Sequence, residues 1–395
     1  RPLPRQPGVR GGDARSARPV AAQFLGTSLW FSVNGVGLSL GQELGLTETD
    51  LGRLTMATQA GFILGTLTLA ATGLADRFRA SRVFAVAAVL GALMNGAFVL
   101  VAWQPAAALV MRFATGLCLA GIYPLGMKLV ISWTPRHTGA ALAWLVGMLT
   151  LGTAVPHLLR GATLGLPWQW PLLTASLLAL VAALLIRALG DGPHLPPPGP
   201  KKPLREGFAA FASGDFRAAA LGYFGHCWEL YAFWTLTPLL VARELQRLGA
   251  GEALVPWLAF LVIALGLVGC VHGGRVSRRR GSLWVARAAL AVSGLLCLVY
   301  PLLGSLSPFL LLALLLLWGF TVIADSPQLS ALAAATAPRD RIGSTLAVMN
   351  AIGFALTIPA IFLVSEFWSA LDLRVAWLLL PGPMVGLFYL CRARL

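Results

Sequence analysis

The sequence predicts an all-α, polytopic membrane protein whose 12 transmembrane helices form two pseudo-symmetric six-helix bundles. Three observations predict this class. The 395 residues are 57% hydrophobic and only 11% charged, whereas about a quarter of the residues in a soluble domain are charged. Apolar runs of about 20 residues, the length that a bilayer-spanning helix needs, recur along the whole chain. The positive charges gather in alternate loops.

The apolar runs define the elements in order. They predict six spans at 19–42, 51–74, 83–103, 106–131, 138–160 and 168–189, and six more at 217–242, 252–273, 283–303, 307–330, 343–365 and 373–391. Residues 1–18 are rich in Arg, Gly and Pro and are predicted to be a disordered tail. A secretory signal is the alternative, but the apolar run that follows is too long and lacks a small-residue cleavage site. The sequence begins with Arg1 rather than Met, which leaves open whether residues precede it.

The distribution of cations sets the predicted topology. Of the 30 Lys and Arg residues, 23 lie in or beside the N-terminal tail, the loops that follow even-numbered spans, and the C-terminus. By the positive-inside rule this side faces the cytoplasm, so both termini are predicted to be cytoplasmic, in a bacterial inner (plasma) membrane. The net charge of +15 is therefore explained by topology and contact with the lipid bilayer, and nucleic acid is not an expected partner.

The chain divides near its middle. Residues 190–216, which include GDGPHLPPPGPKKPLREGF, interrupt the apolar pattern with prolines and charges, as a linker would. We therefore expect a tail at 1–18, an N-terminal bundle at 19–189, a cytoplasmic linker at 190–216 and a C-terminal bundle at 217–395. The two bundles repeat each other at a nearly constant offset, since Gly73, Arg77, Ser81, Gly116 and Pro124 recur as Gly274, Arg278, Ser282, Gly319 and Pro327. A duplicated six-helix unit explains this series.

The loop after the second span carries a family resemblance. GLADRFRASR (73–82) resembles the loop signature of the major facilitator superfamily, with Gly73, Asp76, Arg77 and Arg82 at matching positions and Ala80 or Ser81 where glycine is usual. GGRVSRRRGS (273–282) looks like a degenerate second copy, and Arg112 with Gly116 resembles a second motif of the family. The resemblance implies a monomeric secondary transporter that works by alternating access on a small-molecule substrate.

The charged loop has two interpretations. Asp76 lies near the end of the second span among arginines, and its carboxylate could also meet the positive end of a helix dipole in the other half. The resemblance implies that Gly73, Asp76, Arg77 and Arg82 form a gating latch that holds the cytoplasmic face closed. The alternative is that these charges only anchor a turn and set topology, although an acid contributes nothing to topology.

Two cations lie inside the fourth span, where charged groups are costly and often functional. Arg112 is expected about 10 Å below the outer surface. The resemblance links it to proton coupling or substrate charge, and the alternative is that it braces a neighbouring helix by binding its carbonyls. Lys128 lies near the inner end of the same span. It is predicted to be a cation of the cavity, and the alternative is that its side chain snorkels to the cytoplasmic interface. A straight helix points the two to nearly opposite faces, although the Gly121–Pro124 segment can kink it.

The stretch HCWELYAFW (226–234) places a carboxylate near mid-bilayer. His226 and Glu229 share one helix face, and burial of a carboxylate favours its neutral form. Both are therefore candidate proton-coupling residues, with a structural His226–Glu229 pair as the alternative. Asp325 is a third candidate, predicted either to pair with Lys128 or to cap a helix broken before Pro327.

The predicted substrate site combines these cations with polar and aromatic side chains at cavity depth. Its members are Arg112, Lys128, Tyr123, Asn34, Tyr231, Trp228 and Asn350. Single amides in spans are as often contacts between helices. No catalytic residue, metal site or cofactor is expected, because no metal cluster, nucleophile–base pair or phosphate loop is present and the soluble segments are short. The chain is therefore predicted not to be an enzyme.

The charges divide between the halves, with cations in the first and Glu229 and Asp325 in the second. This division favours proton-coupled symport of a small anionic solute. Parts of the sequence loosely resemble a bacterial branch grouped with nitrate/nitrite porters, but the glycine-rich signatures and the arginines of spans 2 and 8 are missing, which argues against nitrate. Proton-driven efflux of an apolar or cationic compound is the alternative within transport. A non-transporting membrane receptor is the alternative of another class.

Overall fold

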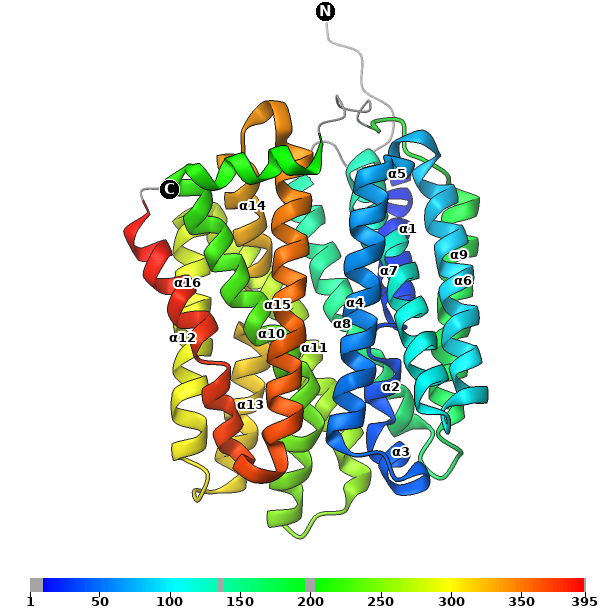
Figure 1. Ribbon diagram of the computed structural model, residues 1–395, viewed down its shortest axis with the longest axis vertical. Helices are drawn as coiled ribbons and strands as arrows, with labels where there is room; N and C mark the ends of the chain where they lie inside the picture. Colours follow the sequence, from blue (N-terminus) through cyan, green and yellow to red (C-terminus); the bar gives the residue numbers. More distant parts are fainter. Residues whose placement is uncertain (1–9, 134–137, 196–202, 394–395) are drawn as a thin grey trace, which may run out of the picture.

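The computed structural model describes the backbone of residues 10–133, 138–195 and 203–393, with side chains described over 17–74, 77–133, 143–195 and 203–393. Every regular element in these ranges is a helix. The first half comprises α1 (Arg10–Thr27), α2 (Ser32–Gly35), α3 (Gly37–Leu44), α4 (Glu48–Thr72), α5 (Leu74–Arg77), α6 (Ala80–Val101), α7 (Pro105–Trp133), α8 (Thr138–Ala162) and α9 (Gln169–Leu189). They run mainly along the long axis of the molecule (Figure 1).

The second half begins after the linker. It comprises η1 (Leu204–Ala212), α10 (Gly214–Arg247), η2 (Glu252–Leu254), α11 (Val255–Arg280), α12 (Ser282–Leu302), α13 (Pro308–Thr321), α14 (Ser326–Thr336), η3 (Arg339–Arg341), α15 (Ile342–Leu371), η4 (Asp372–Leu378) and α16 (Pro381–Arg392). The predicted linker at 190–216 thus contains a 3₁₀ helix, η1, which packs against α15.

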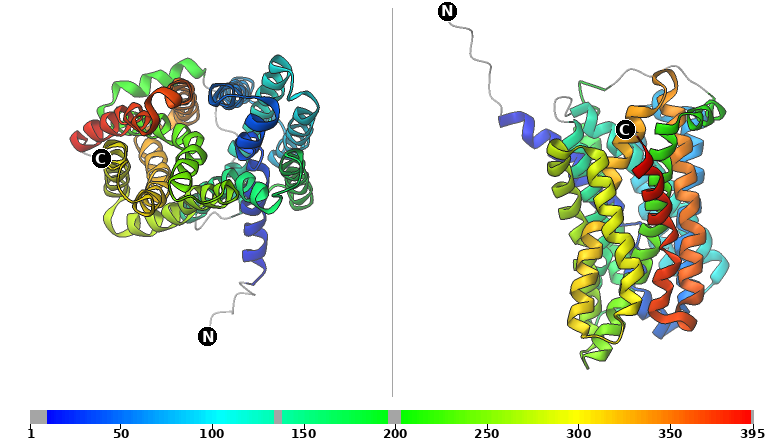
Figure 2. Two further views of the ribbon diagram at one scale, coloured as in Figure 1. Left: turned by 90° about the horizontal axis from the view of Figure 1, so that it is seen from below. Right: turned by 90° about the vertical axis from the view of Figure 1, so that its left-hand side faces the viewer.

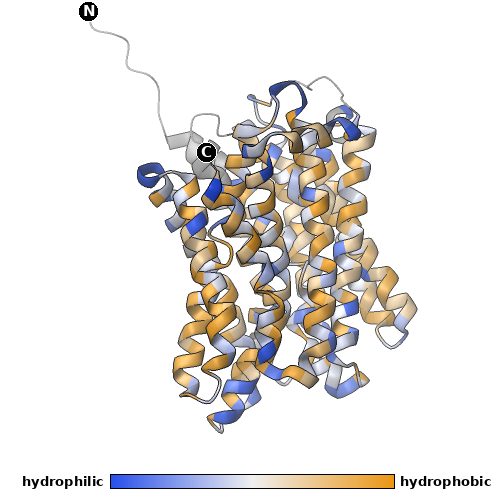
Figure 3. Ribbon diagram, turned by 60° about the vertical axis from the view of Figure 1, so that its left-hand side comes forward, coloured by the Kyte–Doolittle hydropathy of each residue, from blue (hydrophilic) through white to orange (hydrophobic). Residues whose placement is uncertain are grey.

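The helices account for the 12 predicted spans, with α1 to α3, α13 with α14, and η4 with α16 each forming one pass. In the described residues, eight helical stretches are by themselves long and apolar enough to cross a membrane. Hydrophobic residues dominate the middle of the bundle and hydrophilic residues its two ends (Figure 3). We call the end that carries α5 and the last turn of α16 the basic end, because Arg77, Arg82, Arg278 and Arg392 lie in its loops and helix ends.

Two predicted boundaries were wrong. The tail was expected to be disordered to residue 18, but Arg10–Arg18 already belong to α1, which extends beyond the apolar run. The first span was expected to be continuous over 19–42, but the chain leaves helical geometry at 28–31, between α1 and α2. No proline lies in this stretch, and the carbonyls at the break are instead satisfied by a buried arginine described below. The tenth span is broken at 322–325, directly before Pro327, which has no N–H to donate.

Equivalent helix crossings occur in the two halves. A Cβ on Gly61 would collide with the Phe113 carbonyl, and one on Gly116 with the Thr58 carbonyl, so α4 and α7 cross with their backbones in direct contact. Gly269 and Gly319 stand in the same relation to the Phe320 and Val262 carbonyls. Only glycine permits such an approach. The repeated crossing supports the duplicated unit inferred from the sequence.

The two halves meet along two helix pairs. α4 packs against α15, and α8 packs against α11. Seen along the long axis, the helices of the two halves form two groups that lie side by side (Figure 2). The residue boundaries of the two bundles stay a prediction, but these two pairs form the most extensive contacts between the halves. The space between them is where side chains from both halves converge.

Candidate functional site

Aromatic rings fill the centre of the junction. Trp30 at the break after α1, Phe62 on α4 and Phe354 on α15 pack with ring centroids 4.7 Å (Trp30–Phe62) and 4.5 Å (Phe62–Phe354) apart. Tyr231 on α10 lies 5.4 Å from Phe354, and Tyr123 on α7 lies 6.3 Å from Trp30. We call these five residues the central aromatic cluster. Tyr123 is half-buried and the others are buried, so rings from both halves pack together at the centre.

A line of hydrogen bonds crosses the junction beside this cluster. The Trp30 indole Nε1 donates to Gln59 Oε1 at 2.7 Å, and Gln59 Nε2 donates to Thr357 Oγ1 at 3.0 Å. Gln59 is on α4 and Thr357 on α15, so the second bond joins the two halves. Sequence reasoning missed both residues. An amide at mid-span is a usable signal for Gln59, whereas a threonine hydroxyl usually bonds within its own helix and gives none.

Arg112 braces the broken first span. Its Nη2 donates to the carbonyls of Leu29 and Trp30 at 3.2 and 2.7 Å, and its Nη1 donates to Ser32 Oγ and Asn95 Oδ1 at 3.1 and 3.0 Å. The side chain is 1% exposed. These donors satisfy carbonyls that the helix break leaves without intrahelical partners. The contacts therefore match the bracing alternative, and all four bonds go to residues of the first half.

Glu229 lies inside the second half. Its Oε2 accepts from the Ser293 hydroxyl at 2.9 Å, and its Oε1 accepts from the Trp318 Nε1 at 2.7 Å and from the Cys297 thiol at 3.4 Å. The three donors come from α12 and α13, and Glu229 is 1% exposed. The structural pair with His226 is thus wrong. Arg112 and Glu229 are each bonded within their own half.

His226 is paired with Asp325 instead. Its Nδ1 lies 2.8 Å from Asp325 Oδ1, with both side chains buried, although neither atom makes a hydrogen bond of good geometry. Asp325 stands at the start of α14, where its side chain makes no cap bond. Neither predicted role of Asp325 anticipated this partner. The pair joins α10 to the broken tenth span.

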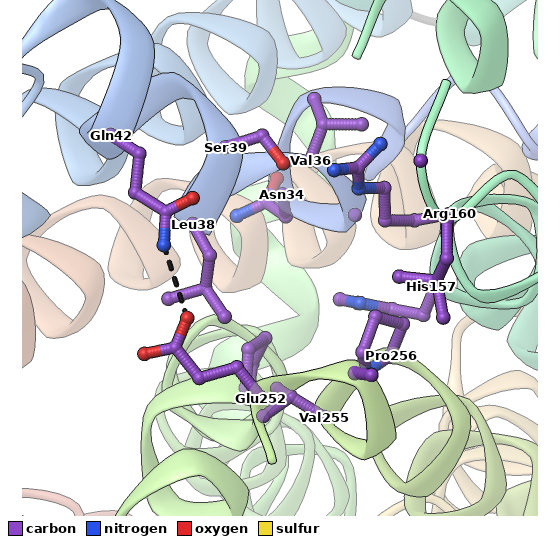
Figure 4. Close-up of a pocket in the computed structure, with 15 residues that line it drawn as sticks. Asn34, Val36, Leu38, Ser39, Gln42, His157, Arg160, Glu252, Val255 and Pro256 are labelled. Atoms are coloured by element: carbon purple, nitrogen blue, oxygen red, sulfur yellow. Dashed lines mark hydrogen bonds between the residues drawn. The ribbon is translucent and has the colours of Figure 1, made fainter. Parts of the chain in front are cut away.

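A pocket of about 340 Å³ lies between the halves at the end opposite the basic end (Figure 4). We call it the vestibule. Its polar residues are Asn34, Ser39, Gln42, His157, Arg160 and Glu252, and its apolar wall includes Pro238, Val255 and Pro256. Gln42 Nε2 donates to Glu252 Oε2 at 3.0 Å, which ties α3 in the first half to η2 in the second. Asn34, a predicted site residue, lines the vestibule and donates to Thr55 Oγ1 at 2.9 Å.

The family model of the Major Facilitator Superfamily matches residues 20–360. The chain belongs to this superfamily. A solved structure of a bacterial homologue of the human lysosomal transporter Spinster, in an inward-facing and unoccupied conformation, is similar with a TM-score of 0.67. That match covers 98% of this chain and 96% of the other at 15% identity, so it shows a shared fold. No curated protein matches the sequence.

The superfamily assignment confirms the predicted all-α, multi-pass membrane fold and the class of secondary transporter. The loop signature of the superfamily lies at the basic end. Gly73 ends α4 in the left-handed conformation at φ 64°, and Arg77 and Arg82 are exposed. The Asp76 side chain lies outside the described side chains. At the start of α6, the Ser81 N–H donates to Asp191 Oδ1 at 2.7 Å, a cap that sequence reasoning missed.

The remaining predicted substrate residues of this superfamily member are spread over the bundle. Lys128 on α7 and Asn350 on α15 are half-buried. Trp228 donates to the Leu378 carbonyl of η4 at 2.9 Å and thus contacts its own half. Of the predicted set, only Tyr123 and Tyr231 belong to the central aromatic cluster. In the described residues, no group of three His, Cys, Asp or Glu side chains is placed to hold a metal ion.

Proposed function

We propose that this protein is a proton-coupled secondary active transporter that moves a small organic anion with an apolar body by alternating access. One observation carries the proposal: α10 bears Tyr231 of the central aromatic cluster and, two residues earlier, the buried Glu229. A change in the protonation of Glu229 would alter its three hydrogen bonds and thereby the position of the helix that supplies Tyr231. Proton binding and substrate binding are coupled through one rigid element.

The central aromatic cluster supports an apolar body in the substrate. Ligand pockets are mostly apolar, with a few polar groups that fix orientation. Here the rings supply the apolar surface, and the polar line through Gln59 lies beside them. Lys128, the second predicted cation of the fourth span, is assigned to the substrate's anionic group.

The orientation belongs to the same proposal. The basic end is assigned to the cytoplasm of a bacterial inner membrane, because cations favour that side, and the vestibule then opens to the outside. The protein is proposed to act as a monomer, with solute and protons as its only partners besides lipid. Opening and closing would exchange the contacts at the two ends of the α4–α15 and α8–α11 pairs.

A second candidate is proton-driven export of a cationic or apolar compound. The faces of Trp and Tyr rings attract cations, and the central aromatic cluster contains three such rings. The probes benzoate and tetraphenylphosphonium separate the two candidate functions, since each has an aromatic, apolar body and the two differ in the sign of their charge.

The proposed function is tested in proteoliposomes with an imposed pH gradient. Wild-type protein is expected to accumulate labelled benzoate faster than protein-free liposomes when the outside is acidic, with the unaided entry of neutral benzoic acid subtracted. Glu229→Gln should lose accumulation by at least about tenfold, because the neutral amide keeps the side chain's size but binds no proton. It should retain benzoate exchange, which needs no net proton movement.

Glu366→Gln is the matched control, because Glu366 is an exposed acid on α15 of the same half. It is expected to transport normally. Full pH-driven accumulation by Glu229→Gln would remove Glu229 from coupling. Transport of tetraphenylphosphonium but not of benzoate would contradict anion transport and support the second candidate function.

A further inference from the structure

We propose that the vestibule is a second binding site, which holds the anionic solute before or after it occupies the centre. This inference rests on the proposed function for the class of solute, but the vestibule is separate from the central aromatic cluster. The carboxylate would contact Arg160 and His157 of α8, and the apolar body would lie against Val255 and Pro256 of α11. A volume of about 340 Å³ suits a small ligand.

Arg160 supplies a pre-positioned cation. Its Nη1 donates to the Leu166 carbonyl at 3.0 Å, which fixes the guanidinium while its other N–H groups stay available. Figure 4 shows the side chain reaching across the pocket toward Asn34 and Val36. A guanidinium presents its donors in a planar fork that matches the two oxygens of a carboxylate. The arginine is half-buried, so water screens it less than a fully exposed cation.

His157 adds an unmet hydrogen-bonding group one turn away. It lines the vestibule and is 1% exposed, and its Nε2 has no partner. Buried polar atoms are normally hydrogen-bonded, so an exception calls for an explanation. A bound carboxylate or a water that it orders would supply the missing partner. His157 and Arg160 lie three residues apart on one helix face.

The opposite wall offers mostly apolar surface. It is formed mainly by Pro238, Val255 and Pro256, which offer apolar surface. The one acid in the pocket, Glu252, already accepts a hydrogen bond from Gln42 at the rim. The donors Arg160, His157 and Asn34 therefore lie on the first-half wall, and the second-half wall is apolar apart from Glu252 at the rim. That division fits a carboxylate attached to a short apolar body.

The site is tested by protection and stability, neither of which needs transport. Leu164, which is 42% exposed and lines the vestibule, is replaced by Cys in a background with Cys118→Ser and Cys391→Ser. Benzoate is expected to slow maleimide labelling of Leu164→Cys and to raise the melting temperature. Arg160→Gln should weaken both effects at least about tenfold in half-maximal concentration, as expected for loss of a charge-assisted pair.

Controls separate the site from folding and from the centre. Phe309→Cys, 69% exposed and outside the vestibule, should be labelled at the same rate with and without benzoate. Arg160→Lys, which keeps the charge but not the fork, should bind with intermediate affinity even if Arg160→Gln fails to fold. Lys128→Gln should leave the protection of Leu164→Cys unchanged.

The outcomes are distinct. Protection that depends on Arg160 supports the site. Absence of protection, equal affinity in the Arg160 variants, or stronger protection by tetraphenylphosphonium overturns it, whether or not benzoate is transported. Protection without flux in proteoliposomes leaves the vestibule site standing and contradicts the proposed function instead.

Discussion

The guanidinium of Arg112 shows how a costly buried charge becomes structural. It donates to two carbonyls of the broken span and to two polar side chains. A charge in hydrocarbon is unfavourable unless such partners compensate it. Here the partners are carbonyl oxygens that would otherwise be unsatisfied. Arginine and helix break therefore stabilise each other, and the break positions Trp30 at the centre.

Replacement of Arg112 is therefore expected to lower stability. Arg112→Gln should cost on the order of 3 kcal/mol, because it removes charge-assisted bonds and leaves buried acceptors unpaired. The stability of Arg112→Lys should lie between those of the wild type and Arg112→Gln, since one ammonium cannot reach all four acceptors. Thermal unfolding in detergent measures both. Arg53→Gln is the control, because the exposed Arg53–Asp50 pair at 3.3 Å should contribute less than about 1 kcal/mol. Unchanged melting of Arg112→Lys with weakened benzoate transport would instead favour a substrate role.

At the residue scale, the sequence identified which groups are buried but not their partners. Arg112, Glu229, His226 and Asp325 were selected because ionisable groups are rare at membrane depth, and the structure buries all four. Their partners lie on other helices, such as Ser293 and Trp318 for Glu229. Spacing along one helix cannot report such contacts, so the alternative of a structural His226–Glu229 pair was wrong.

At the scale of elements, close helix crossings depend on glycine. Gly116→Ala places a Cβ against the Thr58 carbonyl, and Gly319→Ala places one against the Val262 carbonyl. Because both obstacles are backbone, the helices must separate, and each variant is expected to lose about 3 kcal/mol of stability. Thermal unfolding checks this.

The control for these variants is Gly96→Ala in α6, where the nearest atom, Ser176 Oγ, would lie at an ordinary 3.6 Å. This change should be neutral or stabilise by up to about 1 kcal/mol. If Gly116→Ala melts like Gly96→Ala, the close crossing of α4 and α7 is not what holds the first half together.

The spans themselves could be predicted from hydropathy, because length and apolar composition are local properties. The break in the tenth span could also be predicted from the sequence, because Pro327 follows it. The break at 28–31 could not, because GTSLWF contains no helix-breaking proline, and the Arg112 bonds that satisfy its carbonyls come from another helix. Local sequence therefore predicts a helix end well where a nearby residue such as Pro327 causes it. It predicts the end poorly where the carbonyls at the break bond to a side chain from another helix, as with Arg112.

At the scale of the whole molecule, side-chain hydrogen bonds join the two halves at two places in the part of the chain that the structure describes. Gln59–Thr357 lies beside the central aromatic cluster, and Gln42–Glu252 lies at the rim of the vestibule. A link at the middle can persist while the halves rock about it. A link at one end must break when that end opens. Alternating access therefore places different demands on the two contacts.

Locking the rim is expected to stop transport. Gln42→Cys and Glu252→Cys, introduced together in the Cys118→Ser, Cys391→Ser background and joined by a short thiol crosslinker, should reduce benzoate flux at least about tenfold, and cleavage of the linker should restore it. Asp50→Cys with Arg53→Cys, crosslinked within α4, is the matched control and should leave flux unchanged, because both residues move with one helix. Normal flux after complete crosslinking of residues 42 and 252 would mean that this end does not open during transport, and the vestibule could not then exchange solute with the centre.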